Sequence, residues 1–143
     1  MKRFILGAVT LIGGFIVSLF GTWTQSMTTL AIFMGVDLLS GLICAGVFKA
    51  SAKTEGGGLS SKVGFRGLVK KGMIILFVLI GARLDIILGT AYIKDAVCIG
   101  FCANELLSVI ENAGAIGLPL PKVVVDAVEL LQKGDDDSDE DNA

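Results

Sequence analysis

Charged and polar residues interrupt the apolar stretches of this chain, and their chemistry demands partners. Asp37 lies near the middle of the apolar stretch 27–48, and Glu105 follows Asn104 within the stretch 92–112. A charged side chain at the centre of a membrane-spanning helix costs on the order of 2.5–3.5 kcal/mol on insertion scales. Such side chains pair with one another or face water, so these positions indicate a polar helix interface or an aqueous lumen.

Small residues accompany Asp37 at helical spacing. Gly41 and Ala45 follow it at steps of four residues, which is the arrangement that lets two helices approach closely around an inward-facing carboxylate. The pattern fits packing within one chain and self-association between copies equally well. We expect this face to carry helix packing in one of these two forms.

A one-sided polar stripe runs along the stretch 92–112. At about 100° per residue, its polar members fall within an arc of about 120°, and apolar residues fill the remainder. A helix face of this kind is poorly suited to lipid, so it favours a protein interface or an aqueous lumen. The members of the stripe are Asn104, Glu105, Ser108, Glu111 and Asn112.

Arg83 and Asp85 form a further charged pair near the end of the apolar stretch 72–90. An intramembrane ion pair between the two is one interpretation. Contacts with the stretch 92–112, or extension of the side chains to the membrane surface, are the others. The sequence leaves these three alternatives open.

The groups that enzymes and metal sites usually employ are missing from the sequence. The chain has no His, and the glycines at 56–58 precede no Lys-Ser/Thr pair of the phosphate-binding type. General acid–base and nucleophilic catalysis therefore lack their usual groups. The three Cys are an odd number without other ligands, which argues against a metal site. We expect no enzymatic activity, no cofactor and no metal.

Composition indicates that membrane-spanning helices position these residues. The 143 residues are 53% hydrophobic with a mean hydropathy of +0.78, above the roughly 45–50% apolar content of globular proteins. We therefore expect an all-α, multi-pass membrane protein in which residues 1–117 form four transmembrane helices, paired as two hairpins. Three spans is the second choice. The expected spans are residues 4–20, 27–48, 72–90 and 92–112.

Positive charges predict the orientation of the spans. Half of the twelve Lys and Arg residues lie in the polar segment 49–71, between the second and third spans. Cationic loops stay on the cytoplasmic side, so we expect both termini and this loop in the cytoplasm. The cations stand at the ends of apolar runs, which argues against nucleic-acid binding. The topology-determining residues are Lys49, Lys53, Lys62, Arg66, Lys70 and Lys71.

The C-terminal part of the chain is expected to lie outside the spans. Pro119 and Pro121 break the preceding helix. The segment 118–133 shows helical periodicity with its charges on one face, which predicts an amphipathic helix at the membrane interface or against a partner. The acidic segment 134–143 is expected to be a disordered tail, with Gly134 as the helix cap.

Three sequence blocks resemble the phage lysis and toxin-secretion holins, four-span proteins of phages and prophages of Gram-positive bacteria. Residues 37–41, Asp-Leu-Leu-Ser-Gly, are similar to that family's Asp-Tyr-Leu-Thr-Gly block. Residues 60–71 resemble its basic loop, and residues 104–122 resemble its C-terminal block. Leu38 replaces an aromatic residue and Leu107 stands where Gly is frequent, which puts local packing in doubt but not the class.

The resemblance implies a protein that accumulates and oligomerises in the host's bacterial cytoplasmic membrane. There it would form timed lesions that depolarise the membrane and release or activate a phage endolysin for host lysis. A holin-like pore that secretes a large toxin without dedicated lysis, and a membrane adaptor without a pore, are the alternatives. The implied partners are membrane lipid, further copies of the chain, and functionally an endolysin or a secreted toxin, with no nucleic acid.

Overall fold

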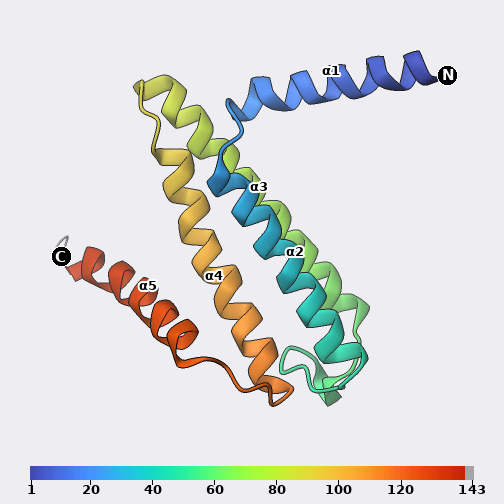
Figure 1. Cartoon of the computed structure of the whole chain (residues 1–143), viewed down its shortest axis with the longest axis vertical. Helices are drawn as coiled ribbons and strands as arrows, with labels where there is room; N and C mark the ends of the chain where they lie inside the picture. The colour runs from blue at the N-terminus through green and yellow to red at the C-terminus, as the bar shows by residue number, and fades with distance from the viewer. Residues whose placement is uncertain (141–143) are drawn as a thin grey trace.

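The computed structural model describes residues 1–140, and all regular elements in this part of the chain are helices (Figure 1). The prediction of an all-α fold is confirmed. The elements are α1 (Lys2–Phe20), α2 (Gln25–Gly46), a short 3-10 turn η1 (Glu55–Gly57), α3 (Ser61–Leu88), α4 (Ile93–Ala115) and α5 (Lys122–Glu140).

Helices α2, α3 and α4 form a bundle, in which α4 packs against both α2 and α3 (Figure 1). Where α3 meets α4, a Cβ atom on Gly81 would lie only 3.1 Å from Lys94 Cα, so a larger residue would push the two helices slightly apart at this close approach. One apolar cluster fills the space between the three helices. Its buried members are Met27, Leu30, Ile74, Val78, Cys98 and Cys102.

Helix α1 points away from this bundle and contains no buried residue (Figure 1). The chain turns at Gly21, whose φ of 70° lies in the left-handed region that favours glycine. The predicted packing of the first two spans as a hairpin is not seen, because α1 makes its contacts with α3 instead. Lipid solvates an apolar helix as well as another apolar helix does, so α1 gains little from a partner.

In the part of the chain that the structure describes, two helices, α1 and α2, are long and apolar enough to cross a membrane. Helices α3 and α4 are of similar or greater length, but α3 carries Arg83 and Asp85, and α4 carries Glu105 and Glu111. The expectation of four spans therefore stays a prediction.

Two helix boundaries differ from the expected ones. Helix α3 begins at Ser61, so residues 61–71 of the polar segment 49–71 are helical. The Ser60 hydroxyl caps this helix by accepting a hydrogen bond from the Val63 amide at 3.4 Å. Helix α5 continues through Gly134 to Glu140 instead of ending there, because its backbone hydrogen bonds are made within the helix and need no partner. The rest of the expected tail, residues 141–143, lies outside the described residues.

Candidate functional site

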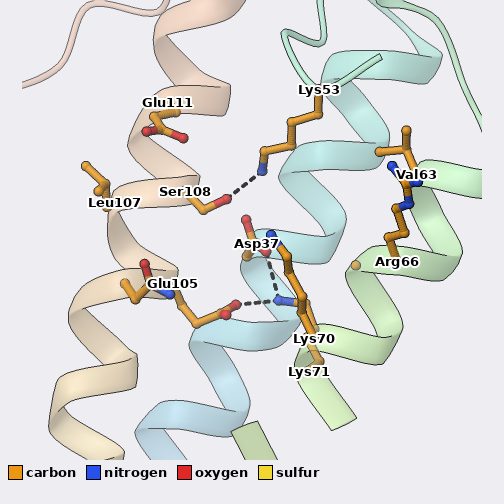
Figure 2. A pocket seen from close by; sticks show the side chains of 12 residues that line it. Asp37, Lys53, Val63, Arg66, Lys70, Lys71, Glu105, Leu107, Ser108 and Glu111 are labelled. Atoms are coloured by element: carbon orange, nitrogen blue, oxygen red, sulfur yellow. Dashed lines mark hydrogen bonds and ion pairs between the residues drawn. The ribbon is translucent and has the colours of Figure 1, made fainter. Parts of the chain in front are cut away.

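A charged triad joins the three helices of the bundle. The Lys71 ammonium on α3 donates a hydrogen bond to Asp37 Oδ2 on α2 at 2.8 Å and another to Glu105 Oε2 on α4 (Figure 2). Only 12%, 14% and 7% of the Lys71, Asp37 and Glu105 side chains are exposed. Two carboxylates share one ammonium, so the triad carries one uncompensated negative charge.

The triad is incompletely satisfied. Asp37 Oδ1 is buried and has no hydrogen-bond partner among residues 1–140. A buried acceptor in that state costs about 1–3 kcal/mol, and more when it is charged. Lys71 compensates one of the two carboxylate charges, and Asp37 Oδ1 is open to a further donor.

Sequence reasoning placed Asp37 and Glu105 at an interface but assigned Lys71 to topology alone. The inward direction of Lys71 could have been predicted from its position on α3. It precedes Ile74 by three residues and Val78 by seven, and both of these residues are buried. At helical periodicity this spacing puts the three side chains on one face, so Lys71 had to point into the bundle.

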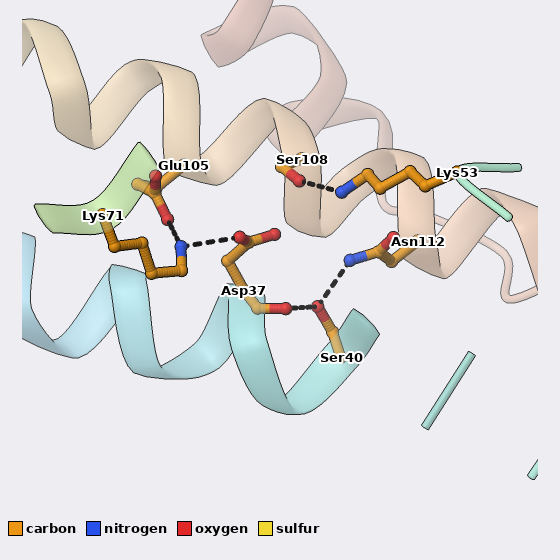
Figure 3. A network of polar contacts seen from close by, with 7 residues as sticks. All are labelled: Asp37, Ser40, Lys53, Lys71, Glu105, Ser108 and Asn112. Atoms are coloured by element: carbon orange, nitrogen blue, oxygen red, sulfur yellow. Dashed lines mark hydrogen bonds and ion pairs between the residues drawn. The ribbon is translucent and has the colours of Figure 1, made fainter. Parts of the chain in front are cut away.

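Further polar contacts extend from the triad along the contact between α2 and α4 (Figure 3). The Asn112 amide donates to Ser40 Oγ at 3.0 Å, and the Ser40 hydroxyl donates to the Asp37 carbonyl oxygen at 3.0 Å. The Lys53 ammonium donates to Ser108 Oγ at 2.6 Å. We call this network the polar seam; its members are Asp37, Ser40, Lys53, Lys71, Glu105, Ser108 and Asn112.

The small residues that follow Asp37 serve packing within one chain. A Cβ atom on Gly41 would lie 3.6 Å from Asn112 Nδ2 of α4, and Ala45 is buried. This face of α2 is therefore occupied by α4. In the structure its contacts are those of helix packing within one chain.

The polar stripe of α4 divides into two sets. Glu105 and Asn112 are buried and Ser108 is half-buried, all within the polar seam. Asn104 and Glu111 are exposed. The stripe therefore faces α2 along one edge and leaves its other edge free.

A cleft of about 420 Å³ lies beside the polar seam, with walls from α2, α3 and α4 (Figure 2). Asn104 and Glu111 belong to its α4 wall, and Arg66 and Lys70 to its α3 wall. Four of the six cations assigned to topology line this cleft, whereas the other two lie exposed and away from it. The lining cations are Lys53, Arg66, Lys70 and Lys71, and the other two are Lys49 and Lys62.

Arg83 and Asp85 are not brought together. Asp85 is buried and Arg83 is exposed, because residues two apart on a helix point in different directions. Asp85 instead accepts hydrogen bonds from the Ile93 and Lys94 amides, both at 2.9 Å, and from Thr90 Oγ1 at 2.6 Å. It thereby caps the N-terminus of α4, where a carboxylate is favourable.

A second polar cluster lies at the opposite end of the bundle, where the α1–α2 and α3–α4 turns meet. The Lys94 ammonium donates to the carbonyl oxygens of Thr22 at 2.6 Å and Phe20 at 3.1 Å. Asp95 Oδ1 accepts from Thr24 Oγ1 at 2.7 Å and from the Ser26 hydroxyl. We call these contacts the turn cluster; sequence reasoning did not find it, because its acceptors are largely main-chain oxygens.

Comparison with known proteins identifies relatives along most of the chain. It is 35% identical over 123 residues to an uncharacterized protein of Listeria innocua, covering 85% of this chain and 82% of that one. It is 31% identical over 131 residues to an uncharacterized 14.9 kDa protein of Clostridium perfringens, covering 90% and 93% of the two chains.

A phage protein is also among the relatives. The chain is 28% identical over 106 residues to a probable holin of Bacillus phage phi105, covering 73% of each chain. No solved structure matches. The model of the bacteriophage holin family matches residues 14–133. The chain therefore belongs to the bacteriophage holin family, a non-enzymatic class of membrane pore-forming proteins.

Proposed function

We propose that this protein accumulates and oligomerises in the bacterial cytoplasmic membrane and opens timed lesions there. The lesions depolarise the membrane and release or activate a phage endolysin, so that the host lyses. The polar seam is the observation that carries this proposal. It is a set of charged and polar side chains held between helices whose other faces are apolar, and such residues in membrane proteins mark polar or water-filled paths.

The proposed topology has four spans with both termini in the cytoplasm. The α2–α3 connection and the α4–α5 connection lie at the same end of the bundle (Figure 1). The cations assigned to topology gather at that end, and cationic segments stay on the cytoplasmic side. The turn cluster then lies at the outer end, with its charged groups engaged in hydrogen bonds.

The polar seam supplies a physical route from dispersed copies to a lesion. In a single copy, Lys71 and the two carboxylates satisfy one another, apart from Asp37 Oδ1. When copies crowd, contacts between chains replace these internal ones, and the polar face of α4 turns toward a growing water-filled hole. The exposed edge of the stripe, Asn104 and Glu111, is where such contacts begin.

Inducible expression in a bacterium with its membrane potential followed over time tests the proposal. An abrupt depolarisation is expected after a period of normal growth, and lysis should follow when an endolysin is expressed as well. Steady accumulation of the protein in the membrane without depolarisation would contradict it.

A double variant tests the part assigned to α4. Asn104→Leu with Glu105→Leu should shift the time of depolarisation, because it replaces one exposed and one buried member of the stripe. A Leu84→Ala variant, at an exposed apolar position of α3, serves as the control. An unchanged schedule in the double variant would remove the stripe from the mechanism.

A further inference from the structure

The α3 wall of the cleft presents two cations that are free to bind a ligand. Arg66 and Lys70 stand one helical turn apart, are exposed, and line the cleft together. Within the described part of the chain, their charged groups form no ion pair and no side-chain hydrogen bond. The other two cations of the cleft are engaged, because Lys71 holds the triad and Lys53 binds Ser108.

Charge within the cleft is separated between its walls. Four cations face three carboxylates, of which Asp37 and Glu105 are bound by Lys71. The third carboxylate, Glu111, lies on the α4 wall (Figure 2). The α3 wall is therefore positive, and an anion placed there meets two donors without displacing an existing contact.

The turns of α3 that follow the two cations, toward the centre of the membrane, carry an apolar face. Met73, Phe77 and Ile80 are 49%, 47% and 52% exposed, and their spacing puts them on the same side of the helix as Arg66 and Lys70. In the proposed topology this face contacts the acyl chains of the cytoplasmic leaflet. Arg66 and Lys70 then stand at the depth of the headgroups, at the border between lipid and the cleft.

We infer that this wall of the cleft binds one acidic phospholipid of the cytoplasmic leaflet. Its phosphate lies between Arg66 and Lys70, with Lys53 across the cleft, and its acyl chains run along Met73, Phe77 and Ile80. Basic pockets between membrane helices on the cytoplasmic side bind acidic headgroups in this way. The inference rests on the proposed membrane orientation. A free phosphate shares the headgroup chemistry but makes no use of the apolar face.

Native mass spectrometry of the purified full chain tests the inference, with phosphatidylglycerol and phosphatidylcholine as the two probes. The wild-type chain should retain phosphatidylglycerol in preference to phosphatidylcholine. A variant with Arg66→Gln and Lys70→Gln should bind phosphatidylglycerol roughly ten- to thirtyfold more weakly. The matched control is Lys49→Gln with Lys62→Gln, which removes the same charge from the same segment outside the cleft and should bind as the wild type does.

Three outcomes would overturn the inference. They are equal retention of the two lipids by the wild type, equal loss in the two double variants, and displacement of phosphatidylglycerol by millimolar inorganic phosphate. The last would assign the site to a free anion. Depolarisation is measured separately: a chain that binds the lipid but never depolarises a membrane would contradict the proposed function and leave the lipid site standing.

Discussion

The bundle of α2, α3 and α4 and the separate helix α1 show two ways for a helix to satisfy its polar groups in a membrane. In α1, Thr10 Oγ1 donates to the Leu6 carbonyl oxygen at 2.9 Å and Ser18 Oγ to that of Phe15 at 2.6 Å. Both hydroxyl side chains of α1 are thus satisfied within their own helix. In the bundle, by contrast, Lys71 requires side chains from two other helices.

This difference teaches what holds the protein together. Apolar surface gives little preference for protein over lipid, so helices associate where polar groups or close packing demand it. The bundle contains both, in the polar seam and at Gly81. Helix α1 has no polar seam and no close glycine contact along its length. It is attached to the bundle at its C-terminal end, where Lys94 binds the carbonyl oxygens of Phe20 and of Thr22 just beyond the helix.

The largest effect is expected for Lys71→Met, because it leaves two carboxylates buried without their ammonium. Breaking a buried charge pair on one side costs about 3–5 kcal/mol. The free energy of unfolding in detergent should fall by that amount, whereas the neighbouring Lys70→Met should change it little. Adding Asp37→Asn and Glu105→Gln to Lys71→Met should restore most of the loss; failure to do so would show that charge is not the cause.

A smaller loss is expected for Asp95→Ala at the turn cluster. The change removes the acceptor of the Thr24 and Ser26 hydroxyls, and hydrogen bonds to charged groups contribute about 1.5–3 kcal/mol. Thermal unfolding should report the loss. Glu111→Ala, which removes an exposed carboxylate from the same helix, is the control; equal losses in both variants would rule out a specific role of the turn cluster.

Gly81→Val tests the close approach of α3 and α4. The added side chain meets the Lys94 backbone at 3.1 Å, and overpacking of this kind costs about 1–3 kcal/mol. Gly72→Val is the matched control on α3, since nothing lies within 4 Å of a Cβ atom at Gly72. Similar stability of the two variants would mean that the helices separate without cost.

The smallest effect is expected for Gly14→Ala in α1. Nothing lies within 4 Å of the added methyl group, so the stability of the single chain should rise only by the helix preference of Ala over Gly, about 0.5–1 kcal/mol. Depolarisation timing is the second measurement. A shift in timing without a loss of stability would show that α1 contacts a neighbouring copy; a loss of stability would instead show that Gly14 packs within its own chain.

The sequence alone predicted the helices and the inward direction of Asp37 and Glu105, because hydrophobic periodicity and the cost of buried charge act locally. It did not predict that Lys71 joins the two carboxylates, since a cation at the end of an apolar run serves topology and pairing equally well. Only the position of α3 in the bundle shows that Lys71 pairs with the carboxylates as well as contributing to topology.

Other parts of the arrangement depend on tertiary contacts that spacing does not reveal. Asp85 caps α4 from a different helix, so no local capping pattern marks it. The separation of α1 was also not predicted, because an apolar helix near α2 in sequence reads as its hairpin partner. The apolar residues of α1 and α2 look alike in sequence. The two helices differ because α1 has no polar group that points toward another helix.

The order of the triad along the chain has a consequence for synthesis. Asp37 is made first, Lys71 follows 34 residues later, and Glu105 follows after 34 more. A nascent chain therefore brings Asp37 to the membrane before Lys71 has been made. The pair of Asp37 and Lys71 is neutral once α3 is in place. The triad then acquires its net negative charge when α4 adds Glu105. Integration of α4 is thus the step at which the triad gains the net negative charge that it carries in the folded chain.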